Sequence, residues 1–345
     1  MTGCKNAYRM PLGGERMKRL IALAVVLALA VAQGLETFWK AVEVPGGVCS
    51  DGSPYRFYVS PGDPKKVVLD FQGGGACWDA ATCGPQSQTY RKRVDAQELL
   101  LAQGIYNRMS VANPFFGWTH VFVPYCTGDL HVGRATVDYG GFKVHHQGAR
   151  NAQAALEYVF RNHAQAERVF VTGCSAGAYG AIFWADKVLA TYKNAQIAVC
   201  GDAGVEVATP DFPGYARWNP RFPELPGLSA RPSVSEIYLA LSRAYPKAVL
   251  AQYTTLLDGT QIYFYALMKG ERSPSEATAR EWATEAQKAV LTPAQAENYT
   301  FYLAPGSQHC ILPRPELYTL KVGEVSFLDW LKALAEGKVA PRVRP

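Results

Sequence analysis

The sequence predicts an α/β fold: one domain with a mostly parallel sheet and helices on both faces. Short runs rich in β-branched residues alternate with segments whose apolar residues recur at helical spacing, which is typical of parallel sheets. The chain has 345 residues, 48% of them hydrophobic, which is enough for one large core. No internal repeat or low-complexity run divides it.

Residues 1–32 are expected to be removed from the folded protein. Met17-Lys18-Arg19 precedes an apolar run at 20–29, and Ala30-Val31-Ala32 follows it. This pattern predicts a secretory signal peptide at about 17–32. The run is shorter than the ~20 residues that a spanning helix needs, so we expect cleavage and no stable membrane anchor. The folded domain would then be 33–345, secreted or periplasmic.

Charge gives little indication of a partner. The whole chain has a formal net charge of +6, but residues 33–345 contain 30 basic and 28 acidic residues. A net charge of +2 gives no support to nucleic-acid or anionic-membrane binding.

The elements follow one another along the chain. Strands are predicted at 55–59, 66–71 and 119–125, a helix at 149–162, and a strand from 169 that runs into a helix after 177. A strand at 196–200 comes next. Residues 208–232 are rich in Pro, Gly and aromatic residues and are interpreted as a surface excursion over the site. Helices at 233–245 and 275–290 and strands at 248–253 and 299–303 complete the pattern.

The Gly-x-Ser-x-Gly pentapeptide at 173–177 lies between a predicted strand and a predicted helix. In that context it predicts a sharp turn that exposes the Ser175 hydroxyl at a helix N-terminus. A glycine-rich turn that only packs closely is the alternative.

A nucleophilic serine needs a base, and the base needs an acid that orients it. In α/β-hydrolases the chain order is Ser, acid, His, and His309 is the only histidine after Ser175. It lies in a loop just past the last predicted strand. Asp258 and Asp202 both follow strands and are candidates for the acid, and Asp258 fits the usual position better.

The segment 72–76, Gln-Gly-Gly-Gly-Ala, follows an early strand. It is similar to the HGGG-type loop of esterases, with Gln in place of His. We expect the N–H groups of Gly74, Gly75 and Ala176 to form an oxyanion hole. The loop lacks the Lys-Ser/Thr pair of a phosphate-binding loop.

Four segments in this order resemble the pectin acetylesterase family, which includes the Notum-type carboxylesterases: 71–78, 123–129, 173–177 and 201–204. The resemblance spans roughly residues 45–312. It implies a secreted serine carboxylesterase on an α/β-hydrolase scaffold, with Ser175 as nucleophile, Asp258 as acid and His309 as base. Family members often carry Trp directly before the loop cysteine, whereas here Trp78 follows Cys77.

The resemblance also suggests two disulfides, Cys77–Cys83 and Cys49–Cys126. Cys174 and Cys200 lie at neighbouring strand ends and are expected to form a third, which leaves Cys310 free. Residues 33–345 contain seven cysteines, so at least one is unpaired or pairs between chains.

The expected activity is removal of small acyl groups, most simply acetyl, from pectin or another polysaccharide. The alternatives are a Notum-like carboxylesterase for longer acyl chains and a catalytically silent glycan- or lipid-binding protein. Trp78, Asp129 and Tyr179 are candidate substrate contacts, with loop capping or core packing as the alternative. No cofactor and no metal site are expected, and the sequence leaves the oligomeric state open.

Overall fold

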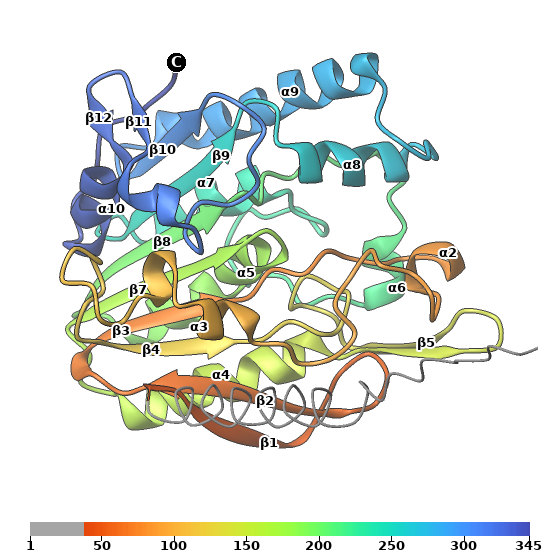
Figure 1. The fold of residues 1–345 in the computed structure, drawn as a ribbon, viewed down its shortest axis with the longest axis horizontal. Coiled ribbons are helices and arrows are strands. Elements are labelled where there is room, and N and C mark those ends of the chain that lie inside the picture. Colours follow the sequence, from red (N-terminus) through yellow and green to blue (C-terminus); the bar gives the residue numbers. More distant parts are fainter. Residues whose placement is uncertain (1–37) are drawn as a thin grey trace, which may run out of the picture.

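The computed structural model describes residues 38–345, so the expected signal peptide at about 17–32 lies outside the described residues. Eight strands of this part form the main sheet, in the order β1-β2-β4-β3-β7-β8-β9-β10 (Figure 1). β2 pairs antiparallel with β1 and β4, and every pair from β4 to β10 is parallel. In sheet order the strands are β1 (Lys40–Val48), β2 (Pro54–Ser60), β4 (Trp118–Val123), β3 (Asp63–Phe71), β7 (Arg168–Cys174), β8 (Gln196–Asp202), β9 (Val249–Thr255) and β10 (Tyr299–Ala304).

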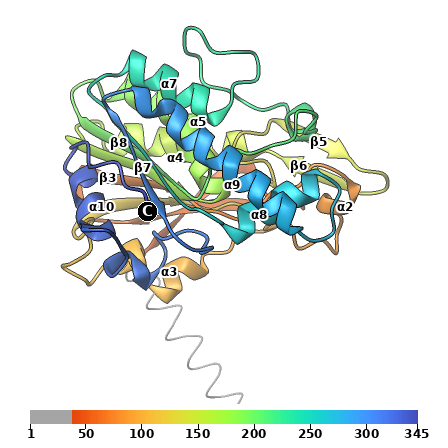
Figure 2. The same ribbon diagram turned by 90° about the horizontal axis from the view of Figure 1, so that it is seen from above.

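Helices cover both faces of the sheet (Figure 2). The face of α4, α5 and α7 is opposite the face of α3 and α10. The helices are α2 (Ala80–Cys83), α3 (Gln97–Leu101), α4 (Gly148–Asn162), α5 (Ala176–Thr191), α6 (Gly214–Trp218), α7 (Val234–Ala244), α8 (Gly259–Met268), α9 (Glu276–Leu291) and α10 (Phe327–Ala335). Two small hairpins, β5 (Ala135–Asp138) with β6 (Lys143–His146) and β11 (Lys321–Val322) with β12 (Val325–Ser326), lie outside the main sheet. Short 3₁₀ turns are η1 (Gly104–Tyr106), η2 (Thr292–Gln295) and η3 (Pro315–Tyr318).

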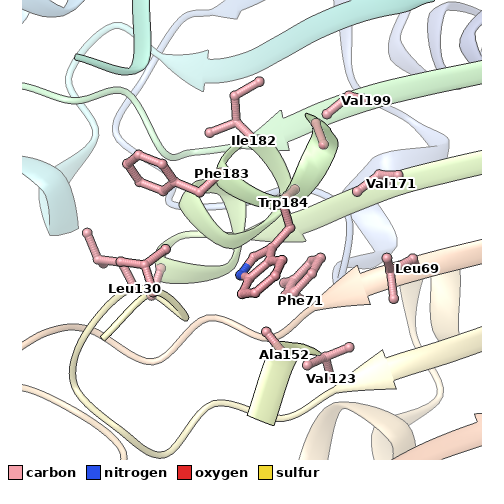
Figure 3. Close-up of a cluster of buried hydrophobic side chains, with 14 of the residues drawn as sticks. Leu69, Phe71, Val123, Leu130, Ala152, Val171, Ile182, Phe183, Trp184 and Val199 are labelled. Carbon is pink, nitrogen blue, oxygen red and sulfur yellow. The ribbon is translucent and has the colours of Figure 1, made fainter. Parts of the chain in front are cut away.

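The core has one layer on each side of the sheet because side chains alternate along each strand. In β3, Leu69 and Phe71 belong to the core beneath α4 and α5, whereas Val68 belongs to the core beneath α10. Figure 3 shows the first of these cores, in which Trp184 of α5 lies beside Phe71. Burial on both faces explains why the central strands are continuous apolar runs rather than alternating ones.

The predicted α/β fold and the predicted strands of the main sheet are confirmed, as are α4, α7 and α9. Among the elements that the sequence analysis missed are β1, α8, α10 and the β5–β6 and β11–β12 hairpins. In α8 the run from Ile262 to Met268 is apolar or aromatic throughout and shows no helical period, so periodicity could not identify it. Among residues 38–345, no helix is both long and apolar enough to cross a bilayer.

Candidate active site

Ser175 occupies a tight turn between β7 and α5. Its backbone has φ 57° and ψ −122°, a conformation that non-glycine residues rarely adopt. The turn packs closely on the end of β3, because a Cβ atom at Gly177 would lie 1.8 Å from the carbonyl oxygen of Phe71. The strained strand–turn–helix unit presents the serine at the N-terminus of α5, as in a nucleophile elbow.

The glycine loop after β3 lies against this turn. A Cβ atom at Gly73 would lie 2.5 Å from the carbonyl oxygen of Cys174, so any side chain here would push the loop away. Gly74 and Gly75 border cavities that Ser175 also borders. Within residues 38–345, the N–H groups of Gly74, Gly75 and Ala176 donate to no protein acceptor. Free N–H groups beside a nucleophile are what an oxyanion hole requires.

Gln72 and His131 hold the start of the glycine loop. The Gln72 amide nitrogen donates to the Asp95 carbonyl oxygen at 2.6 Å, and its amide oxygen accepts the Tyr125 N–H at 3.0 Å. His131 Nε2 lies 2.9 Å from the Gln72 carbonyl oxygen. Burial lowers the pKa of His131 to about 4, so the ring is neutral and donates its Nε2–H to that carbonyl.

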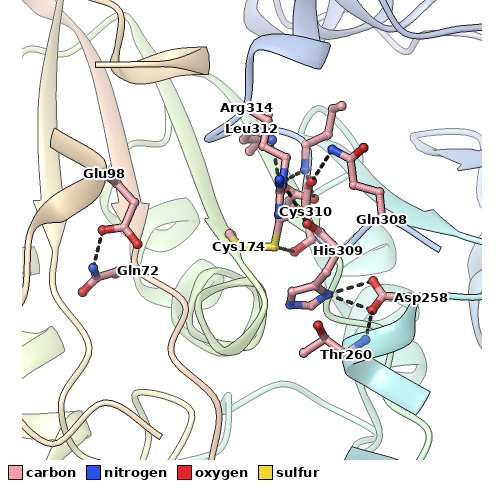
Figure 4. Close-up of a disulfide and its surroundings, with 12 residues drawn as sticks. Gln72, Glu98, Cys174, Asp258, Thr260, Gln308, His309, Cys310, Leu312 and Arg314 are labelled. Carbon is pink, nitrogen blue, oxygen red and sulfur yellow. Dashed lines mark hydrogen bonds and ion pairs between the residues drawn. A yellow bond between two sulfur atoms is a disulfide. The ribbon is translucent and has the colours of Figure 1, made fainter. Parts of the chain in front are cut away.

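His309 and Asp258 meet at the carboxyl ends of β10 and β9. His309 Nδ1 lies 2.9 and 2.8 Å from the two Asp258 carboxylate oxygens (Figure 4). Asp258 is fully buried and caps α8, accepting from the N–H groups of Thr260 and Gln261 at 3.1 and 3.0 Å. His309 Nε2 is buried and has no hydrogen-bond partner among the described residues. It is therefore free to accept a proton from a hydroxyl in the cavity that His309 and Ser175 share.

The third disulfide joins Cys174 to Cys310 rather than to Cys200, so the predicted Cys174–Cys200 bond is wrong. Cys200 is buried and forms no disulfide with any cysteine among residues 38–345. The register of β7 and β8 explains this, because Cys200 lies opposite Thr172, whereas Cys174 lies opposite Asp202. The Cys174–Cys310 bond links the residue before Ser175 to the residue after His309. The two other predicted disulfides, Cys49–Cys126 and Cys77–Cys83, are present.

The cavity beside Ser175 is small, at about 70 Å³, and largely apolar. Three of its walls come from the excursion at 208–232, which supplies Phe212, Tyr215 and Trp218. Tyr179, a predicted substrate contact, borders the cavity and donates its hydroxyl to the Val205 carbonyl oxygen at 3.3 Å. The segment interpreted as an excursion over the site therefore supplies part of the lining of this cavity.

Trp78 and Asp129 do not border this cavity. Trp78 is buried and packs edge-on against Phe212, behind the cavity wall. Asp129 is fully buried, and its carboxylate accepts from the Thr127 hydroxyl and from the N–H of Gly148 at the start of α4. These contacts correspond to the loop-capping and packing alternatives rather than to contact with substrate.

Three polar residues near the site have roles that sequence reasoning missed. Gln261 donates from its amide nitrogen to Asp258 at 3.0 Å and accepts the Val205 N–H at 2.9 Å. Glu206 borders the cavity, and its carboxylate accepts the N–H of Val234 at 2.6 Å. Asp202, considered above as the acid, does not contact the His309 ring and instead binds backbone N–H groups. Gln261 and Glu206 lie in no sequence motif. Asp202 lies in the segment 201–204, but its contacts with Ile311 and Leu312 join residues 109 and 110 positions apart, which the segment itself does not indicate.

In the part of the chain that the structure describes, two groups of side chains come within metal-binding reach, Cys77/Cys83/His146 and Cys174/His309/Cys310. In both groups the two sulfur atoms are bonded to each other. A disulfide offers no thiolate, so neither group is a cysteine-ligated metal site in the oxidised protein.

The sheet order, the elbow at Ser175 and the His309–Asp258 pair after the last two sheet strands define an α/β hydrolase fold. A structure comparison agrees: the Wnt deacylase Notum from Drosophila superposes with a TM-score of 0.61 at 17% identity, over 89% of this chain and 96% of that one.

The chain belongs to the pectinacetylesterase family, whose model matches residues 32–234. Pectin acetylesterase 11 from Arabidopsis thaliana is 29% identical over 202 residues, which is 56% of this chain and 51% of that protein. Palmitoleoyl-protein carboxylesterase notum2 from Xenopus laevis is 26% identical over 168 residues, which is 45% of this chain and 34% of that protein. The match to pectin acetylesterase 11 therefore spans about half of that relative's length. Asp258 and His309 lie beyond the residues that the family model matches.

Proposed function

We propose that this protein is a serine carboxylesterase that removes acetyl or similarly short acyl groups from a polysaccharide. The observation that carries the proposal is the shared cavity of Ser175 and His309, with Asp258 hydrogen-bonded to the far side of the imidazole. Family membership supports ester hydrolysis. The three disulfides fit an oxidising compartment, which agrees with secretion directed by the signal peptide at about 17–32.

In the proposed mechanism the Ser175 hydroxyl attacks the ester carbonyl while His309 Nε2 takes its proton. The Asp258 carboxylate keeps the Nδ1–H tautomer and stabilises the imidazolium that forms. The N–H groups of Gly74, Gly75 and Ala176 stabilise the oxyanion, and the loss of one such donor costs about 10²–10³ in kcat in other hydrolases. His309 returns the proton to the leaving alcohol, and water then hydrolyses the acyl-serine by the same route.

The size of the cavity favours a short acyl group. At about 70 Å³ it has about half the volume of an engineered cavity of roughly 150 Å³ that holds benzene. An acetyl group fits this volume, whereas a palmitoleoyl chain requires the walls to move. Activity on p-nitrophenyl esters from acetate to octanoate tests the proposal: we expect acetate to have the highest kcat/KM. A maximum at octanoate would favour the longer-chain alternative.

A larger groove next to the site favours an acidic polysaccharide. It has a volume of about 990 Å³ and meets the Ser175 cavity at Gly75, Thr260 and Phe264. Four basic and two acidic side chains line it: Arg91, Lys92, Arg93, Lys143, Asp51 and Asp95. Within residues 38–345, neither Lys92 nor Lys143 forms an ion pair. The Lys92 ammonium donates to the carbonyl oxygens of Pro85 and Ser87, which leaves its charge without a carboxylate partner in this part of the chain. Positive charge that is not neutralised in a groove attracts carboxylates such as those of uronic acids.

Charge reversal in the groove tests this part of the proposal. Lys143→Glu should raise KM for acetylated polygalacturonate several-fold and leave p-nitrophenyl acetate hydrolysis unchanged. The effect should weaken as salt rises toward 1 M. Equal KM values for the polymer in the variant and the wild type would exclude a role of this groove in polymer binding.

Ser175→Ala tests the chemistry itself. We expect it to abolish p-nitrophenyl acetate hydrolysis and labelling by a fluorophosphonate, while Ser229→Ala in the exposed excursion retains both. Full activity of Ser175→Ala would refute the mechanism. A wild-type protein that neither hydrolyses esters nor takes the label would favour the silent binding protein.

A further inference from the structure

Asp202, at the carboxyl end of β8, binds the loop that carries His309. Its carboxylate accepts the Ile311 N–H at 3.1 and 3.0 Å and the Leu312 N–H at 2.8 Å. These are the second and third residues after His309. Because both N–H groups converge on one buried carboxylate, the backbone after the base has little freedom to shift.

The same residue also contacts the nucleophile turn. The Asp202 carbonyl oxygen accepts the Ser175 N–H at 2.7 Å, and Cys174 is its partner in the β7–β8 register. Asp202 therefore contacts the segment of the nucleophile through its backbone and the segment of the base through its side chain. It lies between two residues that are 134 positions apart in the chain.

The Cys174–Cys310 disulfide connects the same two segments (Figure 4). Cys310 has φ 56°, a left-handed conformation that is strained for a non-glycine residue and persists only when its surroundings hold it. The sulfur bond holds residue 310, and the carboxylate holds the next two N–H groups. The loop is thus fixed at three consecutive residues.

Burying the Asp202 carboxylate costs folding stability, which argues against a purely structural role for this residue. Asp202 is fully buried, and within residues 38–345 it forms no salt bridge with Lys, Arg or His. Its pKa is raised to about 7 because burial, aided by the charge of Asp258, outweighs the lowering effect of the N–H groups of Leu312 and Ile311 and of the nearby His309. Besides burial, the negative charge of Asp202 helps to raise the pKa of three nearby side chains, Tyr106, Tyr253 and Cys200. A buried group of this kind usually costs stability unless its hydrogen bonds are needed.

We propose that Asp202 is a positioning residue for catalysis, whose carboxylate holds the backbone at 311–312 so that the His309 ring remains beside Ser175 and Asp258. The disulfide reinforces the same loop in parallel. This inference rests on the proposed function, because it assigns Asp202 a role only if His309 is the base. Asp202 does not touch the reacting atoms, and its effect passes through the loop.

The test is Asp202→Asn, with Asp70→Asn as a matched control. Asp70 is also a buried strand carboxylate, but it bonds His120 of β4 rather than the loop that carries His309. In Asp202→Asn one oxygen still accepts an N–H, while the new NH₂ group faces the other donor. In Asp202→Asn we expect kcat for p-nitrophenyl acetate to fall about 10- to 100-fold while KM stays within twofold of the wild type. The acid limb of the pH profile of kcat should also change. Asp70→Asn should keep the wild-type kcat and pH profile. Unchanged kcat in a folded Asp202→Asn protein would overturn the proposal.

A second variant keeps the proposal testable if Asp202→Asn does not fold. In Cys174→Ala/Cys310→Ala the carboxylate is the remaining link, so we expect kcat to fall no more than about threefold and amide exchange at 311–312 to stay slow. Loss of activity together with rapid exchange at these amides would show that the disulfide alone positions the base. Full activity of Ser175→Ala would refute the proposed function itself. If Ser175→Ala is inactive and only the Asp202 variants behave otherwise than expected, the proposed triad is retained and the role of Asp202 is rejected.

Discussion

Replacing Asp258 by Asn separates the catalytic role of this residue from its structural role. The carboxylate binds His309 Nδ1 at 2.8 Å and also caps α8 through the N–H groups of Thr260 and Gln261. Asn is as good an N-cap as Asp, so α8 should remain intact. Its amide, however, no longer stabilises an imidazolium and allows the wrong imidazole tautomer.

The expected loss follows from these contacts. The corresponding Asp→Asn change lowers kcat about 10⁴-fold in a serine protease, and a loss of 10³- to 10⁴-fold corresponds to roughly 4 to 5.5 kcal/mol at about 1.36 kcal/mol per tenfold change. We expect kcat for p-nitrophenyl acetate to fall about 10³- to 10⁴-fold with the melting temperature within about 3 °C of the wild type. Asp79→Asn, at the exposed N-cap of α2, is the matched control and should keep full kcat. A loss below tenfold in Asp258→Asn would refute the assignment of Asp258 as the acid.

Three further predictions follow from the site and the core. Gly177→Ala places a Cβ atom 1.8 Å from the Phe71 carbonyl oxygen, so urea unfolding should show a loss of several kcal/mol or no folded protein; a stability equal to the wild type would contradict the packing at the elbow. Phe212→Ala removes a cavity wall and should move the preference from acetate toward butyrate or hexanoate, whereas the same change at the exposed Phe116 should not. Burial raises the pKa of Asp202 from 3.8 to about 7, so its contribution to the free energy of unfolding is present below about pH 4 and is lost as pH rises to about 7. Asp202→Asn should make urea-derived stability less dependent on pH over that range, and an unchanged pH dependence would contradict the assignment.

Local pattern was sufficient to predict the turn at Ser175 and every strand of the main sheet except β1. The strands are apolar runs of the right length, and the small residues around Ser175 are required by contacts as close as that between Gly177 and Phe71. The order of candidate residues in the chain selected His309 and favoured Asp258, and the structure brings these two into hydrogen-bond contact.

The sequence could not predict contacts that depend on strand register or on long separations. The partner of Cys174 depends on the β7–β8 register, which places Cys200 two residues away from it. The Asp202 carboxylate binds the N–H groups of Ile311 and Leu312, which lie 109 and 110 positions further along the chain. Asp129 was a candidate substrate contact with loop capping as the alternative, and its carboxylate accepts the Gly148 N–H at the start of α4. Helix α8 was missed because all of its faces are apolar or aromatic.

The most direct test of the account is the mass of the peptide that contains residue 175 after reaction with a fluorophosphonate. The account predicts one adduct, on the Ser175 hydroxyl, formed at least 10²-fold more slowly in His309→Ala and absent in Ser175→Ala. An adduct on another residue, or equal labelling rates with and without the imidazole of His309, would contradict it.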